Sequence, residues 1–160
     1  MMPPRAWGRY SGPLTDLLPD DNNVFDGARA TAAMIGVDGS TFFSLRISGV
    51  KKSAVGDSFG AHLHEGQCVA GDGTKALSHY NSDKISGVLG TVPSKTNEVW
   101  LDFKVNSEGA ARSTARVPFV PLGGERAIVL HAEPTTPGTG GAGARLACLP
   151  LDIHTIPSTA

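Results

Sequence analysis

The 160-residue sequence lacks any continuous apolar stretch near the roughly 18 residues that a membrane-spanning helix needs. Its first residues do not lead into the apolar run of a secretory signal. Lysine and arginine form no cluster along the chain, where Lys51-Lys52 is only a pair, and the formal net charge is -1. These absences give no case for a membrane span or for electrostatic binding to nucleic acid or an anionic membrane.

Aromatic residues make up only 6% of the sequence, whereas glycine occurs 20 times and proline 11 times. This turn-rich composition favours an all-β sandwich or barrel over a helical bundle. A chain of this length forms one domain. Only two cysteines are present, Cys68 and Cys148. On their own they fit either a long-range disulfide in an oxidising compartment or two buried thiols in a reducing one.

Two segments of β-branched and apolar residues, 28–37 and 41–49, flank Asp38-Gly39, which is a hairpin turn signal. In the second segment apolar residues alternate with Ser44, Arg46 and Ser48, which predicts one buried and one solvent-exposed face. The buried residues of this strand are expected to be Phe43, Leu45 and Ile47. Further strands are expected at 59–64, 98–105, 110–117, 126–132 and 145–153.

Residues 1–26 show no period of two or 3.6 that persists beyond a few positions, and proline and glycine interrupt them. We therefore predict an N-terminal extension at 1–26, a β-domain at 27–154 and a frayed tail at 155–160. The apolar residues of the extension are expected to pack at most as a short helical turn. His154 is expected to be a surface residue.

The predicted strand at 59–64 ends in His62-Leu63-His64. Alternate side chains leave a strand on the same face with Cα atoms about 6 to 7 Å apart, so both imidazoles can converge on one metal ion. Imidazole suits copper, zinc, iron and nickel, and the spacing does not choose among them. Taken alone, the pair also fits two solvated polar residues. His79 and His131 are further candidate ligands.

Five motifs follow one another along the chain: Gly60-Ala61-His62-Leu63-His64-Glu65, Cys68, Ser78-His79-Tyr80-Asn81, Val129-Leu130-His131 and Gly143-Ala144-Arg145-Leu146-Ala147-Cys148. In these motifs and in their order, the chain resembles the copper-zinc superoxide dismutase family over about residues 28 to 153. The resemblance implies an eight-stranded Greek-key β-sandwich or flattened barrel, with a metal site between two long loops. It also implies copper ligands at His62, His64, His79 and His131, a disulfide between Cys68 and Cys148, and a substrate-holding cation at Arg145.

The sequence departs from the zinc-containing members of that family between residues 81 and 97. Those members place two further histidines and an aspartate there, whereas this segment has no histidine and its one carboxylate, Asp83, cannot hold zinc. We therefore expect one copper ion and no zinc, with His79 as a terminal ligand. Glu98 is either a hydrogen-bond acceptor that orients His79 or a solvated glutamate. The loop at 133–144 has Glu133 as its only charge, so we expect copper to be open to solvent.

The resemblance implies a copper-only superoxide dismutase, an oxidoreductase in which Arg145 and His79 are catalytic. The alternative is a copper-binding or copper-storage protein on the same fold, which would not need Arg145. A partner-binding module that kept only the scaffold is a third reading, but such a module would tolerate the loss of a ligand. A disulfide implies an extracellular, periplasmic or cell-envelope location with a signal or anchor removed. Superoxide is the expected partner, and the protein is expected to be a monomer or homodimer.

Overall fold

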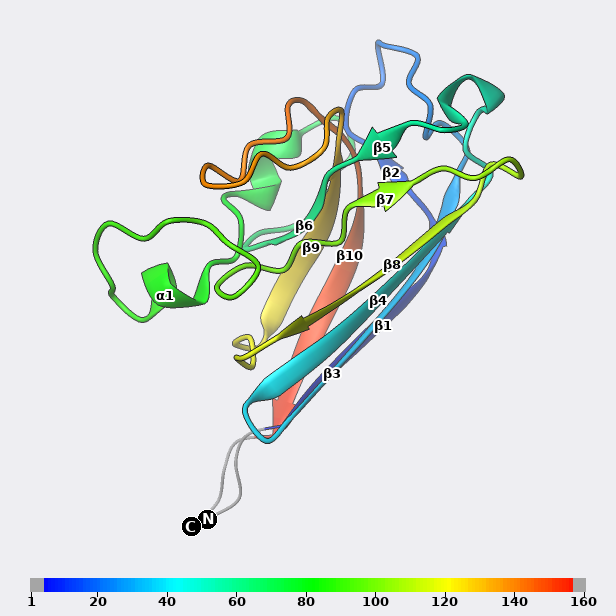
Figure 1. Ribbon diagram of the computed structural model, residues 1–160. Coiled ribbons are helices and arrows are strands. Elements are labelled where there is room, and N and C mark those ends of the chain that lie inside the picture. The colour runs from blue at the N-terminus through cyan, green and yellow to red at the C-terminus, as the bar shows by residue number, and fades with distance from the viewer. Residues whose placement is uncertain (1–4, 157–160) are drawn as a thin grey trace.

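The computed structural model describes residues 5–156 and shows an all-β protein (Figure 1). The main antiparallel sheet has the strand order β6-β9-β10-β1-β3-β4-β8, and β2 pairs with β10 beside this path. The sheet curls into a half-barrel that is compatible with an eight-stranded β-sandwich, so the predicted fold class is confirmed. A second sheet pairs β5 with β7. The strands are β1 (Arg5–Pro13), β2 (Thr15–Asp16), β3 (Arg29–Val37), β4 (Ser40–Ser48), β5 (Ser58–Phe59), β6 (Ala61–His64), β7 (Phe103–Lys104), β8 (Ala111–Val117), β9 (Gly124–His131) and β10 (Arg145–Ile156).

Strands β3 and β4 form the hairpin that the sequence predicts. Asp38 and Gly39 connect them with positive φ angles of 55° and 80°, and Val37 pairs with Ser40. Two consecutive residues of positive φ match the right-handed twist of the flanking strands. Along β4, Phe43, Leu45 and Ile47 are buried, and the intervening residues face outward, as the alternation predicts.

The prediction of an N-terminal extension is wrong. Residues 5–13 form β1, which lies between β3 and β10 inside the main sheet. Its fully buried positions, Ala6, Gly8 and Gly12, are small, and Tyr10 on the same face is partly buried against the core. A Cβ atom on Gly8 would lie 2.7 Å from the carbonyl oxygen of Asp152, so the neighbouring strand leaves no room for a larger side chain. Because Tyr10 is the one large residue on this face, the sequence shows no alternation of large apolar and polar residues over β1.

The other end of the chain also extends the sheet further than expected. Strand β10 runs to Ile156, past the predicted domain boundary at residue 154. His154 is exposed, as predicted, and stacks on Trp7 of β1 with 5.2 Å between ring centroids. Residues 157–160 of the predicted tail and residues 1–4 of the predicted extension lie outside the described residues.

The expected strand at 98–105 is shorter in the structure, where only β7 remains of it. Its first half instead makes isolated bridges, which pair His62 with Trp100 and Asn81 with Glu98. In the part of the chain that the structure describes, the helical elements are one short helix, α1 (Ser82–Ile85), and two 3-10 turns, η1 (Lys52–Ala54) and η2 (Gly73–Ala76). Within residues 5–156, no helix has the length and apolar character to cross a membrane.

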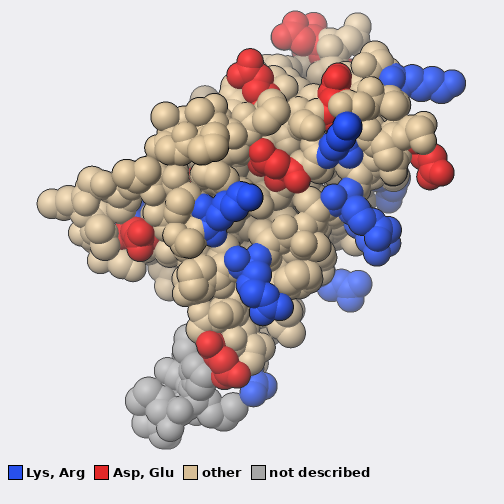
Figure 2. Space-filling view, viewed as in Figure 1, with Lys and Arg blue, Asp and Glu red and all other residues tan. Residues whose placement is uncertain are grey.

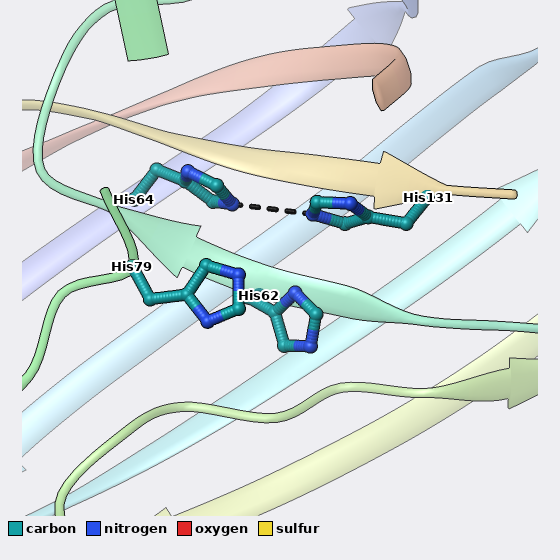
Figure 3. Close-up of side chains that lie close together, drawn as sticks. All are labelled: His62, His64, His79 and His131. Atoms are coloured by element: carbon teal, nitrogen blue, oxygen red, sulfur yellow. Dashed lines mark hydrogen bonds between the residues drawn. The ribbon is translucent and has the colours of Figure 1, made fainter. Parts of the chain in front are cut away.

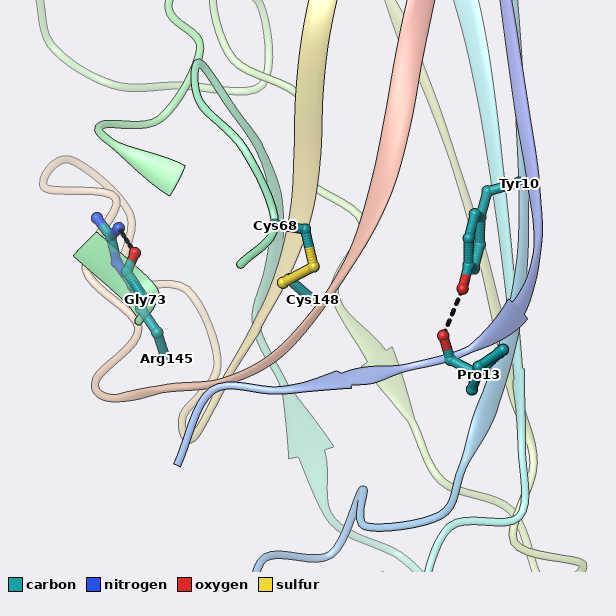
Figure 4. Close-up of a disulfide and its surroundings, with 6 residues drawn as sticks. All are labelled: Tyr10, Pro13, Cys68, Gly73, Arg145 and Cys148. Atoms are coloured by element: carbon teal, nitrogen blue, oxygen red, sulfur yellow. Dashed lines mark hydrogen bonds between the residues drawn. A yellow bond between two sulfur atoms is a disulfide. The ribbon is translucent and has the colours of Figure 1, made fainter. Parts of the chain in front are cut away.

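A disulfide joins Cys68, in the loop after β6, to Cys148 of β10 (Figure 4). The two Cα atoms are 5.8 Å apart, and the bond spans a sequence separation of 80 residues. Closing a loop of this length contributes on the order of 4 kcal/mol in the chain-entropy account. The pairing that the resemblance implies is thus present. A buried disulfide is consistent with an oxidising, extracellular environment.

The close approach at Gly8 makes the place of β1 in the sheet testable. We expect Gly8→Ala to lower the free energy of unfolding by roughly 1 to 3 kcal/mol, because the added methyl group meets the backbone of β10. Urea unfolding measures this change. Gly141→Ala is the control, since a Cβ there meets only the Thr139 hydroxyl at 3.5 Å. Equal stabilities of the two variants would contradict a tightly packed β1.

Candidate metal centre

Four histidines from three separate segments meet at one end of the sheet (Figure 3). His62 and His64 lie on β6, His131 ends β9, and His79 lies in the loop that follows η2. One ring nitrogen from each residue lies within 4.8 Å of the other three. The first three are buried, whereas the side chain of His79 is 19% exposed. The structure thus brings together all four predicted ligands.

Two of the rings are held from behind by backbone carbonyl groups. Nδ1 of His64 lies 3.0 Å from the Leu77 carbonyl oxygen, and Nδ1 of His131 lies 3.2 Å from the Gly143 carbonyl oxygen. A carbonyl oxygen only accepts hydrogen bonds, so both Nδ1 atoms carry the ring proton. This tautomer leaves Nε2 of each ring with a free lone pair.

The His79 ring is held by a carboxylate. Its Nδ1 donates to Glu98 Oε1 at 2.9 Å, and Glu98 also accepts from Trp100 Nε1 at 3.0 Å and from Asn81 Nδ2 at 3.1 Å. Burial acts to raise the pKa of Glu98, but these hydrogen bonds outweigh it and the pKa lies below its usual value. Glu98 is therefore an ionised acceptor that orients His79, and not a solvated glutamate.

The His62 ring is held by a pair of residues that sequence reasoning missed. Nε2 of His62 lies 2.6 Å from the Thr135 hydroxyl, and that hydroxyl donates to Asp102 Oδ1 at 2.7 Å. The Thr135 oxygen must therefore accept a proton from His62 Nε2, which leaves Nδ1 without one. The backbone NH of Thr135 donates to the other oxygen of Asp102 at 2.8 Å. No periodicity or motif in the sequence links these two residues, which are 33 positions apart.

The ring nitrogens that face one another therefore all present lone pairs. Nε2 of His64 and Nε2 of His131 lie only 3.3 Å apart, and Nδ1 of His62 is buried without a hydrogen-bond partner. Burial lowers the pKa of His64 to about 2 and that of His131 to about 4, so a second ring proton is unfavourable near neutral pH. Lone pairs that converge in a buried site without protons fit a metal cation, although imidazole alone does not choose which one.

Arg145 stands beside this cluster. It begins β10 opposite His131, and its Nη1 donates to the Gly73 carbonyl at 2.7 Å (Figure 4). Its positive charge adds to burial in lowering the pKa values of His64 and His131. Arg145 also lines a hollow of about 580 Å³ together with Ser78. None of the four histidines lines this hollow, and its lining also includes the Glu65 carboxylate.

The segment between residues 81 and 97 contributes no ligand to the cluster. Asn81 caps α1 by accepting from the backbone NH of Lys84 at 3.1 Å. Asp83, its single carboxylate, accepts from Asn97 Nδ2 at 3.2 Å instead of joining the histidines. His154, the fifth histidine, lies apart from the cluster against Trp7.

Comparison with known proteins supports the fold but does not assign a function. No protein-family model matches the sequence, and no curated protein matches it. Among solved structures, the crystal structure of the clock protein EA4 is similar, with a TM-score of 0.63. The match covers 95% of this chain and 96% of that chain at 20% sequence identity. A likeness at this identity shows the fold alone.

The hydrogen bond between His62 Nε2 and the Thr135 hydroxyl predicts the effect of Thr135→Val. Valine keeps the shape but removes the hydroxyl, so His62 Nε2 loses its acceptor and the ring loses its fixed tautomer. We expect copper affinity to fall about 10- to 100-fold in a competition titration. Thr136→Val is the matched control because the neighbouring Thr136 is exposed. If both variants bind copper as the parent does, Thr135 does not position His62.

The lowered pKa values predict how stability of the metal-free protein depends on pH. The folded-state pKa of His131 is about 4 and the unfolded value is 6.5, so below pH 6.5 the unfolded state takes up the proton first. Stability is thus lost as the pH falls from 6.5 to about 4, by about 3 kcal/mol for His131 alone. Urea unfolding at several pH values should show a smaller dependence in His131→Gln. His154→Gln, at an exposed site, is the control and should leave the dependence of stability on pH unchanged. If His131→Gln leaves it unchanged as well, His131 is not the source of this dependence.

Proposed function

We propose that this protein is a copper-only superoxide dismutase. The observation that carries the proposal is the convergence of one ring nitrogen from each of four histidines, next to Arg145, which pairs with His131 across β9 and β10. The resemblance of the histidine, arginine and cysteine motifs to the copper-zinc superoxide dismutase family selects copper among the metals that imidazole binds. The proposed substrate is superoxide, and the proposed site residues are His62, His64, His79 and His131 with Arg145.

The residues present fit copper. Neutral imidazoles are ligands for both oxidation states of the metal, and each ring here already holds its other nitrogen in a hydrogen bond. Copper, when bound, supplies one-electron exchange, which oxidises one superoxide to oxygen and reduces a second, with two protons, to hydrogen peroxide. Because His79 gives its Nδ1 to Glu98, this ring does not offer that nitrogen to a second metal, which supports a site without zinc.

Arg145 has the role of binding the substrate. Superoxide is a small anion, and a guanidinium stays charged and offers several donors in one plane. The bond from Nη1 to the Gly73 carbonyl fixes the group while its remaining N–H donors stay available at the hollow. A positioned cation in a partly desolvated site stabilises bound anionic charge more than one in water.

His79 has the role of holding the proton that the second half of the reaction consumes. It is the most exposed of the four rings, so it has access to solvent. Glu98 fixes the Nδ1 proton, so Nε2 is the atom that would take up a proton whenever it does not hold the metal. The hollow of about 560 Å³ that His79 and Glu98 line provides a path for water.

A copper-binding or copper-storage protein on the same fold is the second candidate. The burial of His62, His64 and His131 favours it, because a closed site retains metal well. Storage does not require a cation at the hollow, so Arg145 separates the two candidates. For either function we propose an extracellular, periplasmic or cell-envelope location, on the basis of the disulfide, and a monomer or homodimer.

The test is superoxide dismutation by the copper-loaded, zinc-free protein, normalised to bound copper. We expect Arg145→Ala to lower the rate at least about tenfold, because the anion loses its binding group. Lys75→Ala is the control, since it removes one positive charge from an exposed residue near the same hollow. We expect it to change the rate much less.

The outcomes separate the two candidates. A rapid rate that depends on Arg145 more than on Lys75 supports the dismutase. A rate at background level with one tightly bound copper ion per chain would reject the enzyme and leave the copper-binding protein. Equal effects of the two charge removals would show that Arg145 acts only through the general electrostatic field.

A further inference from the structure

The outer face of the main sheet carries six of the eight arginines of the chain. They occupy outward-facing positions on β1, β3, β4 and β8, and all six are exposed. Between residues 5 and 156, none of them forms an ion pair within 4.0 Å. Figure 2 shows several blue side chains over and beside β8. The six are Arg5, Arg9, Arg29, Arg46, Arg112 and Arg116.

Three of these arginines, Arg29, Arg46 and Arg112, line one hollow of about 430 Å³. Arg46 of β4 and Arg112 of β8 are directly opposite each other in the ladder. Arg29 lies diagonal to Arg46, because Arg46 pairs with Thr31 on the other side. Directly opposite side chains in an antiparallel pair have Cβ atoms about 5 Å apart, and like charges there repel each other. The fold thus keeps a repulsive pair with no carboxylate within ion-pair distance of either member.

The remaining polar groups of the hollow suit an anion. Ser11, Thr31 and Ser48 add hydroxyl groups, which can donate hydrogen bonds. Glu108 is the one carboxylate in the lining. Three guanidinium groups and one carboxylate leave a net charge of +2 around the hollow. Guanidinium donors match the oxygen spacing of phosphate, and a phosphate monoester carries a charge close to -2 near pH 7.

We propose that this hollow binds a phosphate group, as free phosphate or as part of a larger molecule such as the headgroup of phosphatidic acid. Arg46 and Arg112 contact the phosphate oxygens from adjacent strands, and Arg29 completes the site from β3. The bound dianion replaces the repulsion between Arg46 and Arg112 with two attractions. The site lies on β3, β4 and β8, whereas the histidines lie on β6, β9 and a loop, so it is independent of the metal centre.

The test measures phosphate binding by the full, disulfide-bonded chain. Inorganic phosphate is titrated by calorimetry, and Tm is compared with that in chloride at equal ionic strength. We expect Arg46→Gln and Arg112→Gln each to weaken phosphate binding at least about tenfold. Without phosphate, each variant should have a Tm equal to or above that of the parent, because a like-charge contact is removed.

Arg5→Gln is the matched control. It removes the same charge from the same sheet face, but Arg5 lies six residues, or about 20 Å, from Ser11 along β1. We expect this variant to bind phosphate as the parent does. An equal loss in the Arg5 and Arg46 variants would reject a built site, because it would show a response to total charge alone.

A second arm identifies the source of the phosphate group. Sedimentation with phosphatidylcholine vesicles that contain a minor share of phosphatidic acid tests the headgroup. Vesicle binding that free phosphate displaces and Arg46→Gln abolishes supports a lipid source, whereas binding of free phosphate without vesicle binding supports a soluble ligand. No effect of phosphate beyond that of chloride, together with no vesicle binding, would overturn the proposal.

Discussion

The candidate metal centre depends on the hydrogen bonds that hold each imidazole ring from behind. A histidine ring offers a lone pair on only one nitrogen, and the partner of the other nitrogen decides which one it is. Here two carbonyl oxygens, one carboxylate and one hydroxyl backed by Asp102 make that choice for four rings. Each choice leaves the lone pair on the nitrogen that faces the other rings. The chemistry of the site thus follows from groups that never face the metal position.

Most of these groups lie in loops, and the sheet and the disulfide keep the loops in place. Leu77, whose carbonyl holds His64, has a φ of 60° and a ψ of -152°, a conformation that is unfavourable for any residue except glycine. The loop that carries it is attached to β10 through Cys68 and Cys148, and it packs over β9 and β10 through Ala76. The disulfide therefore contributes to the order of the metal centre as well as to the stability of the fold.

The sequence predicts the parts of this structure that a short period or motif encodes. The β3-β4 hairpin follows from alternation and an Asp-Gly turn, and His62 and His64 follow from the geometry of a strand. Strand β1 is not predicted because its fully buried positions, Ala6, Gly8 and Gly12, are small, and the close approach at Gly8 allows nothing larger there. The sequence also does not predict the contact of Thr135 with Asp102 or the facing arginines of β4 and β8. Only the folded chain places such distant residues side by side.

The most direct test of this account is the tautomer of each histidine in the metal-free protein at neutral pH, read from the nitrogen chemical shifts of the imidazole rings by NMR. The account predicts that His62 carries its proton on Nε2, whereas His64, His79 and His131 carry theirs on Nδ1. A metal ion should then shift His62 Nδ1 and the three Nε2 resonances. Protons on the nitrogens that face the cluster, or rings that exchange between tautomers, would contradict a site prepared in advance for a metal ion.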